Sequence, residues 1–477
     1  MSRSYDALVV GSGPNGLAAA ITLQRCGLSV LVLEARSSIG GGMRTQELTL
    51  PGFKHDVCSA VHPLLKSSPF FQTLPLAEYG LEFIHPPVPL AHPLEGETSA
   101  LLSHSMENTA TDLGADQAAY RKLLQPMLRD WTAEAKRFLS PLYIHPSNIF
   151  DLSKFAWHAL RSAEVIAGNF QTEKAKGLWA GLAGHAMLPF EQRMTGASAL
   201  ILAGAAHAVG WPIVKGGSGC IAKAMGSYFQ DLGGVIETNV EVNHIQDLPP
   251  YKALLFDLGP RQILDIMGSS FPLQYQRSLR KYRYGMGVFK IDWALQEAVP
   301  FRDPGCRQAG TLHLGGTFAE IARAEQQTFR GQHVSNPFVL FAQPSLFDPT
   351  RAPENKHVAW AYCHVPHGSS RDMTQAIEAQ VERFAPGFKA CIIERHTYNA
   401  RQMQAYNPNY IGGDINGGIM DLKQLFFRPV PSLSPYRTAR KGVYICSAST
   451  PPGGGVHGMC GYHAAKTALK DIFRITL

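Results

Sequence analysis

Three glycines near the start of the chain have the spacing of a phosphate-binding turn. Gly11, Gly13 and Gly16 follow the apolar run 5–10. In such a turn the first glycine permits a tight bend, the second lets the backbone approach a pyrophosphate, and the third lets a helix pack closely on the sheet. We expect that helix over residues 14 to about 25, with its N-terminal N–H groups and positive dipole end facing the phosphates.

An acidic residue at the end of the next apolar run supports the same interpretation. Glu34 follows residues 31–33 and lies eighteen positions after Gly16. A carboxylate there can accept hydrogen bonds from an adenosine ribose and would repel a 2′-phosphate, so FAD or NAD fits and NADP does not. The alternative is a glycine-rich turn that holds no ligand. The strand, glycines, helix and carboxylate together favour a dinucleotide site.

A second glycine cluster, Gly40-Gly41-Gly42-Met43-Arg44, comes soon after Glu34. Glycines at this place suit close backbone approach to a further stretch of phosphate and ribityl chain, and a guanidinium at Arg44 suits phosphate oxygens. This cluster favours FAD over NAD. A surface loop without a ligand is the alternative.

Together these motifs resemble the FAD-binding signature of the flavin amine oxidase and phytoene desaturase superfamily. Residues 51–63 are similar to the phytoene-desaturase-like branch, which would bring them beside the isoalloxazine, and residues 442–458 resemble its closing flavin motif. The resemblance spans the chain and implies FAD as cofactor. The cofactor-binding residues we expect are Gly11, Gly13, Pro14, Asn15, Gly16, Glu34, Ala35, Arg36, Gly40, Gly41, Gly42, Met43, Arg44, Val242, Ser449, Val456 and His457.

The closing segment also has a physical interpretation of its own. A short strand over residues 443–446 leads to the Pro-Pro-Gly-Gly-Gly turn 451–455, and a helix is expected from about Val456 to Leu469. Such a turn presents free N–H groups, which suit the negative charge of a reduced flavin. The superfamily often has glycine and an acidic residue where this chain has Ser447-Ala448-Ser449. Hydroxyl groups therefore take the place of that carboxylate.

Composition excludes several classes of protein. The 477 residues are 45% hydrophobic and 17% charged, which predicts a large core and more than one domain. The net charge is +7 and the sequence has no run of five basic residues, so nucleic acid is not expected as a partner. Peripheral contact with an anionic membrane stays open.

No stretch reaches the roughly 18 apolar residues of a membrane span. Only four residues precede the first strand, and we expect a cytoplasmic protein.

Cysteine and histidine spacing adds two negative expectations. None of the eight cysteines forms a C-x-x-C or C-x₄-C pair, which excludes a redox-active dithiol and fits reduced thiols. Cys58 and Cys460 are of most interest, because their motifs would approach the flavin. The 18 histidines show no metal-ligand spacing, and we predict no metal site.

The predicted fold is α/β: a Rossmann-like FAD-binding domain of the two-dinucleotide-binding-domain flavoprotein type, interleaved with an α+β substrate domain. Helical spacing, as over residues 116–139, predicts a helical cap within residues 76–210. Alternating patterns predict a mainly antiparallel sheet within residues 259–430. The expected boundaries are 1–75, 211–258 and 431–477 for the FAD-binding domain, 76–210 for the helical region and 259–430 for the substrate domain with its sheet.

A flavin needs chiefly a carbon placed near its N5 and water excluded, so no acid–base pair is compulsory. Candidate polar groups of the cavity are His62, His185, His207, His313, Tyr410 and His457, and the glycine-rich segment 409–418 resembles one that lines the cavity in the family. His457 is the preferred catalytic candidate because its motif would lie at the flavin. We expect an FAD-dependent dehydrogenase or desaturase of a mostly apolar, polyene-like or lipid-like small molecule. A flavin amine oxidase, a flavin-dependent isomerase and a non-catalytic flavin-binding protein are the alternatives; substrate, electron acceptor and oligomeric state stay open.

Overall fold

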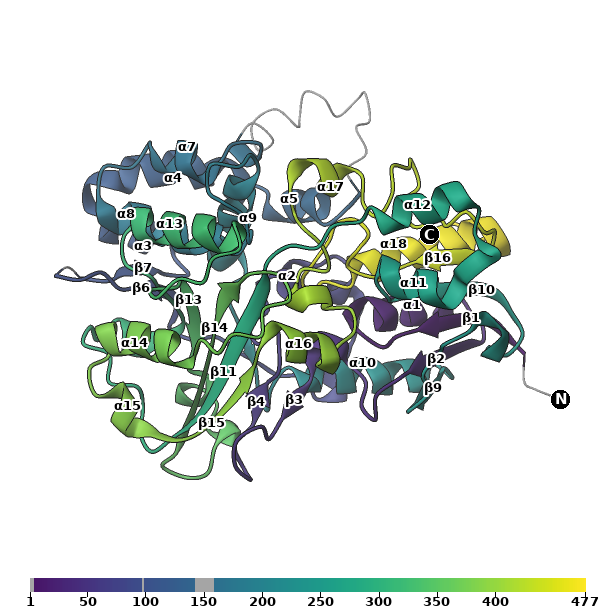
Figure 1. Ribbon diagram of the computed structural model, residues 1–477, viewed down its shortest axis with the longest axis horizontal. Helices are drawn as coiled ribbons and strands as arrows, with labels where there is room; N and C mark the ends of the chain where they lie inside the picture. Colours follow the sequence, from purple (N-terminus) through teal and green to yellow (C-terminus); the bar gives the residue numbers. More distant parts are fainter. Residues whose placement is uncertain (1–3, 97, 142–157) are drawn as a thin grey trace.

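Two sheets of different construction organise the chain. The computed structural model describes residues 4–96, 98–141 and 158–477. One sheet is five-stranded and parallel, and the other is seven-stranded and mainly antiparallel. Figure 1 shows the parallel sheet toward the right of the view and the larger sheet toward the left. The predicted mixed α/β architecture is thus confirmed.

The parallel sheet brings together strands from distant parts of the sequence. In spatial order they are β16 (Val443–Ile445), β10 (Tyr251–Phe256), β1 (Tyr5–Val10), β2 (Val30–Glu34) and β9 (Val235–Thr238). The central pairings place Val10 beside both Leu33 and Phe256. Because these strands are parallel and end together, the residues at their carboxyl ends lie at one edge of the sheet, where open α/β sheets bind ligands.

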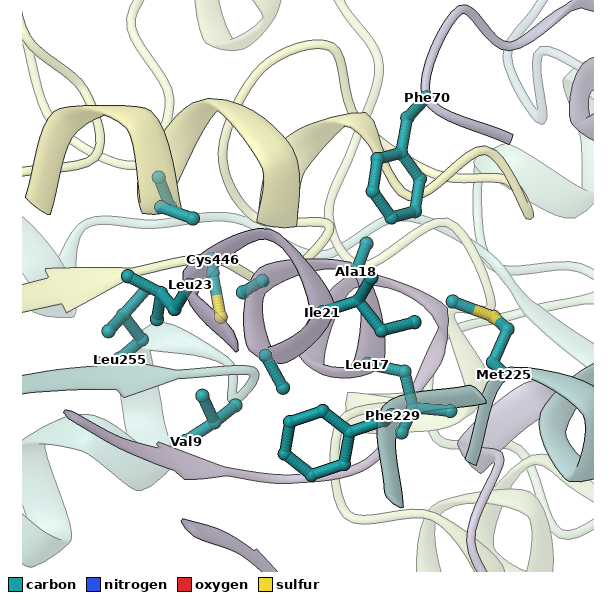
Figure 2. Packing of buried hydrophobic residues seen from close by; sticks show 14 of the residues in the cluster. Val9, Leu17, Ala18, Ile21, Leu23, Phe70, Met225, Phe229, Leu255 and Cys446 are labelled. Atoms are coloured by element: carbon teal, nitrogen blue, oxygen red, sulfur yellow. The ribbon is translucent and has the colours of Figure 1, made fainter. Parts of the chain in front are cut away.

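Helices cover both faces of this sheet. On one face α1 (Pro14–Gln24), α10 (Gly219–Asp231) and α18 (Met459–Ala468) enclose the core, and on the other face lie α11 (Pro260–Met267) and α12 (Leu273–Arg280). Figure 2 shows Leu17 and Ile21 of α1 directed toward Met225 and Phe229 of α10. The strands are apolar almost throughout because both of their faces are buried.

The last helix begins later than the sequence suggests. The sequence predicts a start at about Val456, whereas α18 begins at Met459, after Gly458 with a left-handed φ of 68°. Gly461 then packs against the first turn of α1, where an added Cβ would lie 1.8 Å from the Asn15 carbonyl oxygen. This close approach fixes the N-terminus of α1 relative to the closing segment.

The seven-stranded sheet includes two strands from a region expected to be mostly helical. Its order is β15 (Ile392–Tyr398), β11 (Gly287–Leu295), β14 (His357–Val365), β13 (Val339–Ala342), β12 (Ala309–Leu314), β6 (Val88–His92) and β7 (Ala100–Leu102). Only the β12–β6 pairing is parallel. Residues 76–210 are expected to be mostly helical, and β6 and β7 are two short strands within them whose few residues show little periodicity.

The two faces of this sheet differ in chemistry. On one face Phe289, Ile291 and Trp293 belong to an apolar core with α14 (Thr374–Phe384) and α15 (Phe388–Cys391). On the opposite face two rows of directly paired residues cross three strands, Thr311–Ala342–Trp360 and His313–Leu340–Tyr362. Because side chains alternate along a strand, these rows point away from the apolar core.

A layer of helices stands over that second face, at the upper left of Figure 1. It contains α3 (Met106–Asp112), α4 (Gln117–Leu128), α5 (Trp131–Phe138), α7 (Ala163–Ala167), α8 (Glu173–Gly184), α9 (Thr195–Ala208) and α13 (Phe318–Phe329). The helix expected over 116–139 is in fact two, because Asp130 caps α5 by accepting from the Ala133 amide. Within the described residues, no helix has the length and apolar character needed to cross a membrane.

Short elements complete the connections between the layers. They are α2 (Pro63–Ser67), α16 (Ala400–Tyr406), α17 (Leu422–Phe426) and the two-residue strand pairs β3 (Thr45–Gln46) with β4 (His55–Asp56) and β5 (Phe83–Ile84) with β8 (Ile213–Val214). Among them α16 packs on β11 and α2 on α9, so both lie next to the space between the sheets.

Candidate functional site

A cavity of about 570 Å³ extends from the carboxyl edge of the parallel sheet to the second face of the larger sheet. We call one part the loop end; it is lined by residues 10–15, 33–36, 240–243 and 257–259. We call the other part the far end; it is lined by Ala60, Val61, His62, Leu64, His185, Leu202, Trp211, Thr311, Leu340, Trp360 and Tyr362. Between them lie Gly41, Gly42, Arg44, Cys58, Tyr406 and Tyr410. The cavity therefore connects both sheets.

The two glycine clusters meet at the loop end. A Cβ built on Gly41 would lie 3.0 Å from the Cα of Gly13, and one built on Gly13 would lie 2.6 Å from a carboxyl oxygen of Asp257. There is no room for side chains at either position. Bare backbone from both clusters is therefore presented to the cavity, as close approach of an extended phosphate-containing ligand requires.

Glu34 is held firmly at the end of β2. Its Oε2 accepts from the Ser12 amide at 3.1 Å, and its Oε1 accepts from the Arg36 amide at 2.9 Å and from the Arg44 guanidinium at 3.1 Å. Arg44, which we expected to face phosphate oxygens, also donates to the carbonyl of Ser38. Its present partners make Arg44 a group that orients Glu34.

Asp257 is a residue of this end that sequence reasoning missed. It follows β10, is 6% exposed, and accepts a hydrogen bond from the Gly16 amide at 3.0 Å, while the Gly13 amide also faces its carboxyl group. Burial is the main cause that raises its pKa to about 8, despite these hydrogen bonds. A signal was present, since an acidic residue after a strand that neighbours β1 must end near the glycine turn.

Most of the expected cofactor residues line the cavity. These are Gly11, Gly13, Pro14, Asn15, Glu34, Ala35, Arg36, Gly41, Gly42, Arg44, Val242, Ser449 and Val456. The cavity wall does not include Gly16, Gly40, Met43 or His457, which lie behind it. Ser12 and Asn243 line it as well and were not anticipated, and Ser447, one of the hydroxyl residues noted in the closing segment, also lines it.

His457 is fixed by the backbone of its own turn. Its Nδ1 accepts from the Met459 amide at 3.0 Å, and its Nε2 donates to the Gly453 carbonyl at 3.1 Å. Burial lowers the pKa of this imidazole to about 4, so the ring is neutral at physiological pH. With both nitrogens engaged and the ring behind the wall, the geometry gives His457 a positioning role and does not support contact with a substrate.

Two tyrosines cover the second glycine cluster. A Cβ on Gly42 would lie 2.3 Å from the Tyr410 hydroxyl oxygen, which also interacts with the Cys58 thiol. The Tyr406 hydroxyl donates to the Gly41 carbonyl at 3.3 Å. Burial raises the pKa of Cys58 above its usual value, so this thiol stays protonated. It fills space beside the cavity rather than offering a reactive thiolate.

The far end is apolar and uncharged. None of the described residues lining it is Asp, Glu, Lys or Arg. Trp360 and Tyr362 form an aromatic wall with nearly parallel rings, 3° apart in plane and 6.0 Å apart in centroid. His62 and His185 contribute to the wall, but His207, another candidate, lies outside it and binds the Tyr120 hydroxyl at 2.7 Å. A neutral, mostly apolar molecule fits these surroundings.

Two buried polar atoms without protein hydrogen-bond partners lie at or next to the loop end. They are the Asn15 Oδ1 and the Gln262 Oε1, both on residues that line the cavity. Native proteins pair nearly all buried polar atoms, so these two are available to a polar ligand, as a dinucleotide would be. Across the described part of the chain, no group of three or more His, Cys, Asp or Glu residues is arranged to hold a metal ion.

Comparison with known proteins agrees with this geometry. A family model described as an NAD(P)-binding Rossmann-like domain matches residues 9–74. The mouse pyridine nucleotide-disulfide oxidoreductase domain-containing protein 2 is 26% identical and aligns with 99% of this chain and 94% of its own length. A limonene dehydrogenase chain of Castellaniella defragrans is 22% identical, with coverage of 98% and 95%, and the lycopene-forming phytoene desaturase of Pantoea ananas is 22% identical, with 97% and 98%.

Among solved structures, wild-type putrescine oxidase bound to putrescine superposes with a TM-score of 0.64 at 15% identity and covers all of both chains. At that identity the likeness shows a shared fold. The chain therefore shares the fold of putrescine oxidase and is similar in sequence to a phytoene desaturase over 97% of its length. The resemblance drawn from the glycine clusters and the closing motif is confirmed.

Proposed function

We propose that this protein is an FAD-dependent oxidoreductase that dehydrogenates or desaturates a neutral, mostly apolar small molecule. The observation that carries the proposal is the continuity of the cavity, which joins a dinucleotide-type glycine turn to an uncharged, aromatic-lined far end. Bound FAD would supply the acceptor for a hydride removed from a substrate carbon.

The loop end has suitable groups for each portion of the dinucleotide. Glu34 would accept from the ribose hydroxyls, and the Asn15 amide, one of those that an α-helix leaves without an intrahelical partner, would donate to the pyrophosphate. Residues 240–243 would offer backbone groups to the adenine. These assignments use only residues that line the cavity.

The far end supports the choice of substrate class. A diamine would bring ammonium charge to a place where the described lining has no carboxylate, at a high desolvation cost. Two relatives are named for hydrocarbons, limonene and phytoene. The eight free cysteines, with no paired spacing, argue against the dithiol chemistry suggested by the name of the mouse relative. Trp360, Tyr362 and Leu340 would instead hold a carbon skeleton and exclude water.

Anaerobic reduction of the purified flavoprotein tests the proposal. Absorbance of oxidised flavin would be followed while limonene, a polyene, putrescine and a primary monoamine are added in separate runs. Bleaching by a terpene or polyene, with slow or no bleaching by the amines, is the expected result. A protein purified without flavin that fails to take up added FAD, or one bleached fastest by putrescine, would overturn it.

A further inference from the structure

A half-buried histidine that lines the far end of the cavity, His185, is hydrogen-bonded to a buried histidine, His313. His185 follows the last turn of α8 and His313 lies on β12, and their Nε2 atoms are 3.0 Å apart. Burial lowers the pKa of His185 to about 3 and that of His313 well below its usual value. Both rings are neutral, so one Nε2 donates a proton to the other.

The direction of this hydrogen bond follows from the environment of His313. Its Nδ1 is buried without a hydrogen-bond partner, and Gly181 packs so closely that an added Cβ would lie 2.5 Å from it. An orphaned buried N–H is rarer than an orphaned acceptor, so this nitrogen carries no proton. His313 therefore donates through Nε2, His185 accepts, and the remaining proton of His185 is on Nδ1. Because His185 lines the cavity, that N–H is a donor available to a ligand.

Further polar groups without partners occupy the neighbouring wall. The Trp360 indole nitrogen, which can only donate, and the Thr311 hydroxyl are buried and unpaired. Thr311 and Trp360 lie in one row of the sheet, separated by Ala342, and are 5% and 6% exposed. The nearby acid Glu325 is already paired with His364 at 2.7 Å. The wall thus has open donors at Trp360 and His185, a Thr311 hydroxyl that can donate or accept, and one open acceptor, the His62 Nδ1, which is also buried without a partner.

We infer that the far end recognises a neutral oxygen acceptor, a carbonyl or hydroxyl oxygen, on an otherwise apolar substrate, with His185 as the donor and His313 as the residue that positions it. A carboxylate is disfavoured, because no cation lines the described far end, and Lys290, whose Nζ lies 5.8 Å from the Trp360 ring centroid, is already paired with Asp292. A pure hydrocarbon would fit the apolar wall but leave these donors unpaired, so it should bind more weakly than an oxygenated analogue. The inference rests on the proposed function and specifies its substrate class.

Matched ligand pairs test the inference on FAD-loaded protein. Limonene and carvone share a ring skeleton and differ by a carbonyl group, and an octadecene and octadecanone form a linear pair. Anaerobic titration would follow the shift of the flavin absorbance to obtain Kd. The oxygenated member of at least one pair should bind roughly tenfold more tightly, the magnitude of one or two neutral hydrogen bonds.

Variants assign the effect to the histidine pair. His185→Phe should abolish the preference while flavin content and hydrocarbon binding persist, His185→Gln should retain part of it through its amide donor, and His313→Phe should weaken it. His207→Gln, outside the cavity, is the control. Equal binding within both pairs, binding of neither pair, or an unchanged preference in His185→Phe overturns the inference. Loss of flavin from the wild type would instead overturn the proposed function.

Discussion

The side chain of Asp257 accepts a hydrogen bond from the backbone amide of Gly16 at 3.0 Å, although the two residues are 241 positions apart in sequence. The carboxyl group therefore holds the backbone of the glycine turn, and Asp257 also lines the cavity. Glu34, at the end of the neighbouring strand, adds to the rise of the Asp257 pKa through its charge. Two acidic side chains thus flank a turn that must receive an anion.

This arrangement predicts a pH-dependent affinity for FAD. Asp257 is neutral in the folded protein up to its pKa of about 8, and its negative charge at higher pH would repel the diphosphate. Besides Glu34, the titratable groups facing it are Cys446 and Cys460. FAD affinity should fall above about pH 8 in the wild type and change little in Asp257→Asn, as measured by quenching of FAD fluorescence.

Stability of the apoprotein should follow the same group. The folded state keeps a proton on Asp257 that the unfolded chain releases above the ordinary carboxyl pKa of 3.8. The stabilising contribution of the protonated Asp257 is therefore present at acid pH and is lost as pH rises through about 8. The melting temperature of Asp257→Asn minus that of the wild type should therefore increase as the pH is raised from acid to alkaline values. Asp265→Asn, at an exposed position on the cavity rim, is the control. A constant difference across this range would contradict the prediction.

Substitution of Gly13 should yield apoprotein. The Cβ of Gly13→Val would lie 2.6 Å from the Asp257 carboxyl oxygen, and its methyl groups would occupy the space where the diphosphate must approach. Gly168→Val is the matched control, because there the Cβ meets its nearest atom at 3.5 Å. Absorbance of oxidised flavin per protein should be nearly lost only in the first variant. Full yellow colour in Gly13→Val would refute the FAD assignment.

Local sequence predicted the strands and the helix around the glycine turn of the loop end, because they are encoded together within the first 45 residues. What it could not supply were partners brought by parallel pairing of distant strands, such as Asp257, or by antiparallel register, such as Trp360 beside Ala342. The sequence favours His457 on its motif alone. The role of this residue depends on hydrogen bonds of a turn that has no repeating pattern.

Nicotinamides should be poor reductants of the bound flavin. In the sequence we identify one dinucleotide-binding pattern, the glycines and the acidic residue of residues 11–34, and FAD would occupy that site. NADH and NADPH should bleach the flavin much more slowly than an active apolar substrate in anaerobic stopped-flow measurements. Rapid stoichiometric bleaching by either nicotinamide would show that a second dinucleotide site exists.

Filling the far end should separate substrate binding from cofactor binding. Leu340 lies between His313 and Tyr362 in one row of the sheet, lines the cavity and is 2% exposed. Leu340→Trp would place a larger ring in space meant for substrate, and overpacking costs about 1–3 kcal/mol where neighbours cannot move. Ligand affinity should fall roughly tenfold or more, because that free energy is lost from binding, while flavin content stays close to wild type. Leu340→Ile, which conserves volume, is the control. If Leu340→Trp loses FAD and keeps its apolar ligands, the far end belongs to the cofactor and the substrate must bind elsewhere.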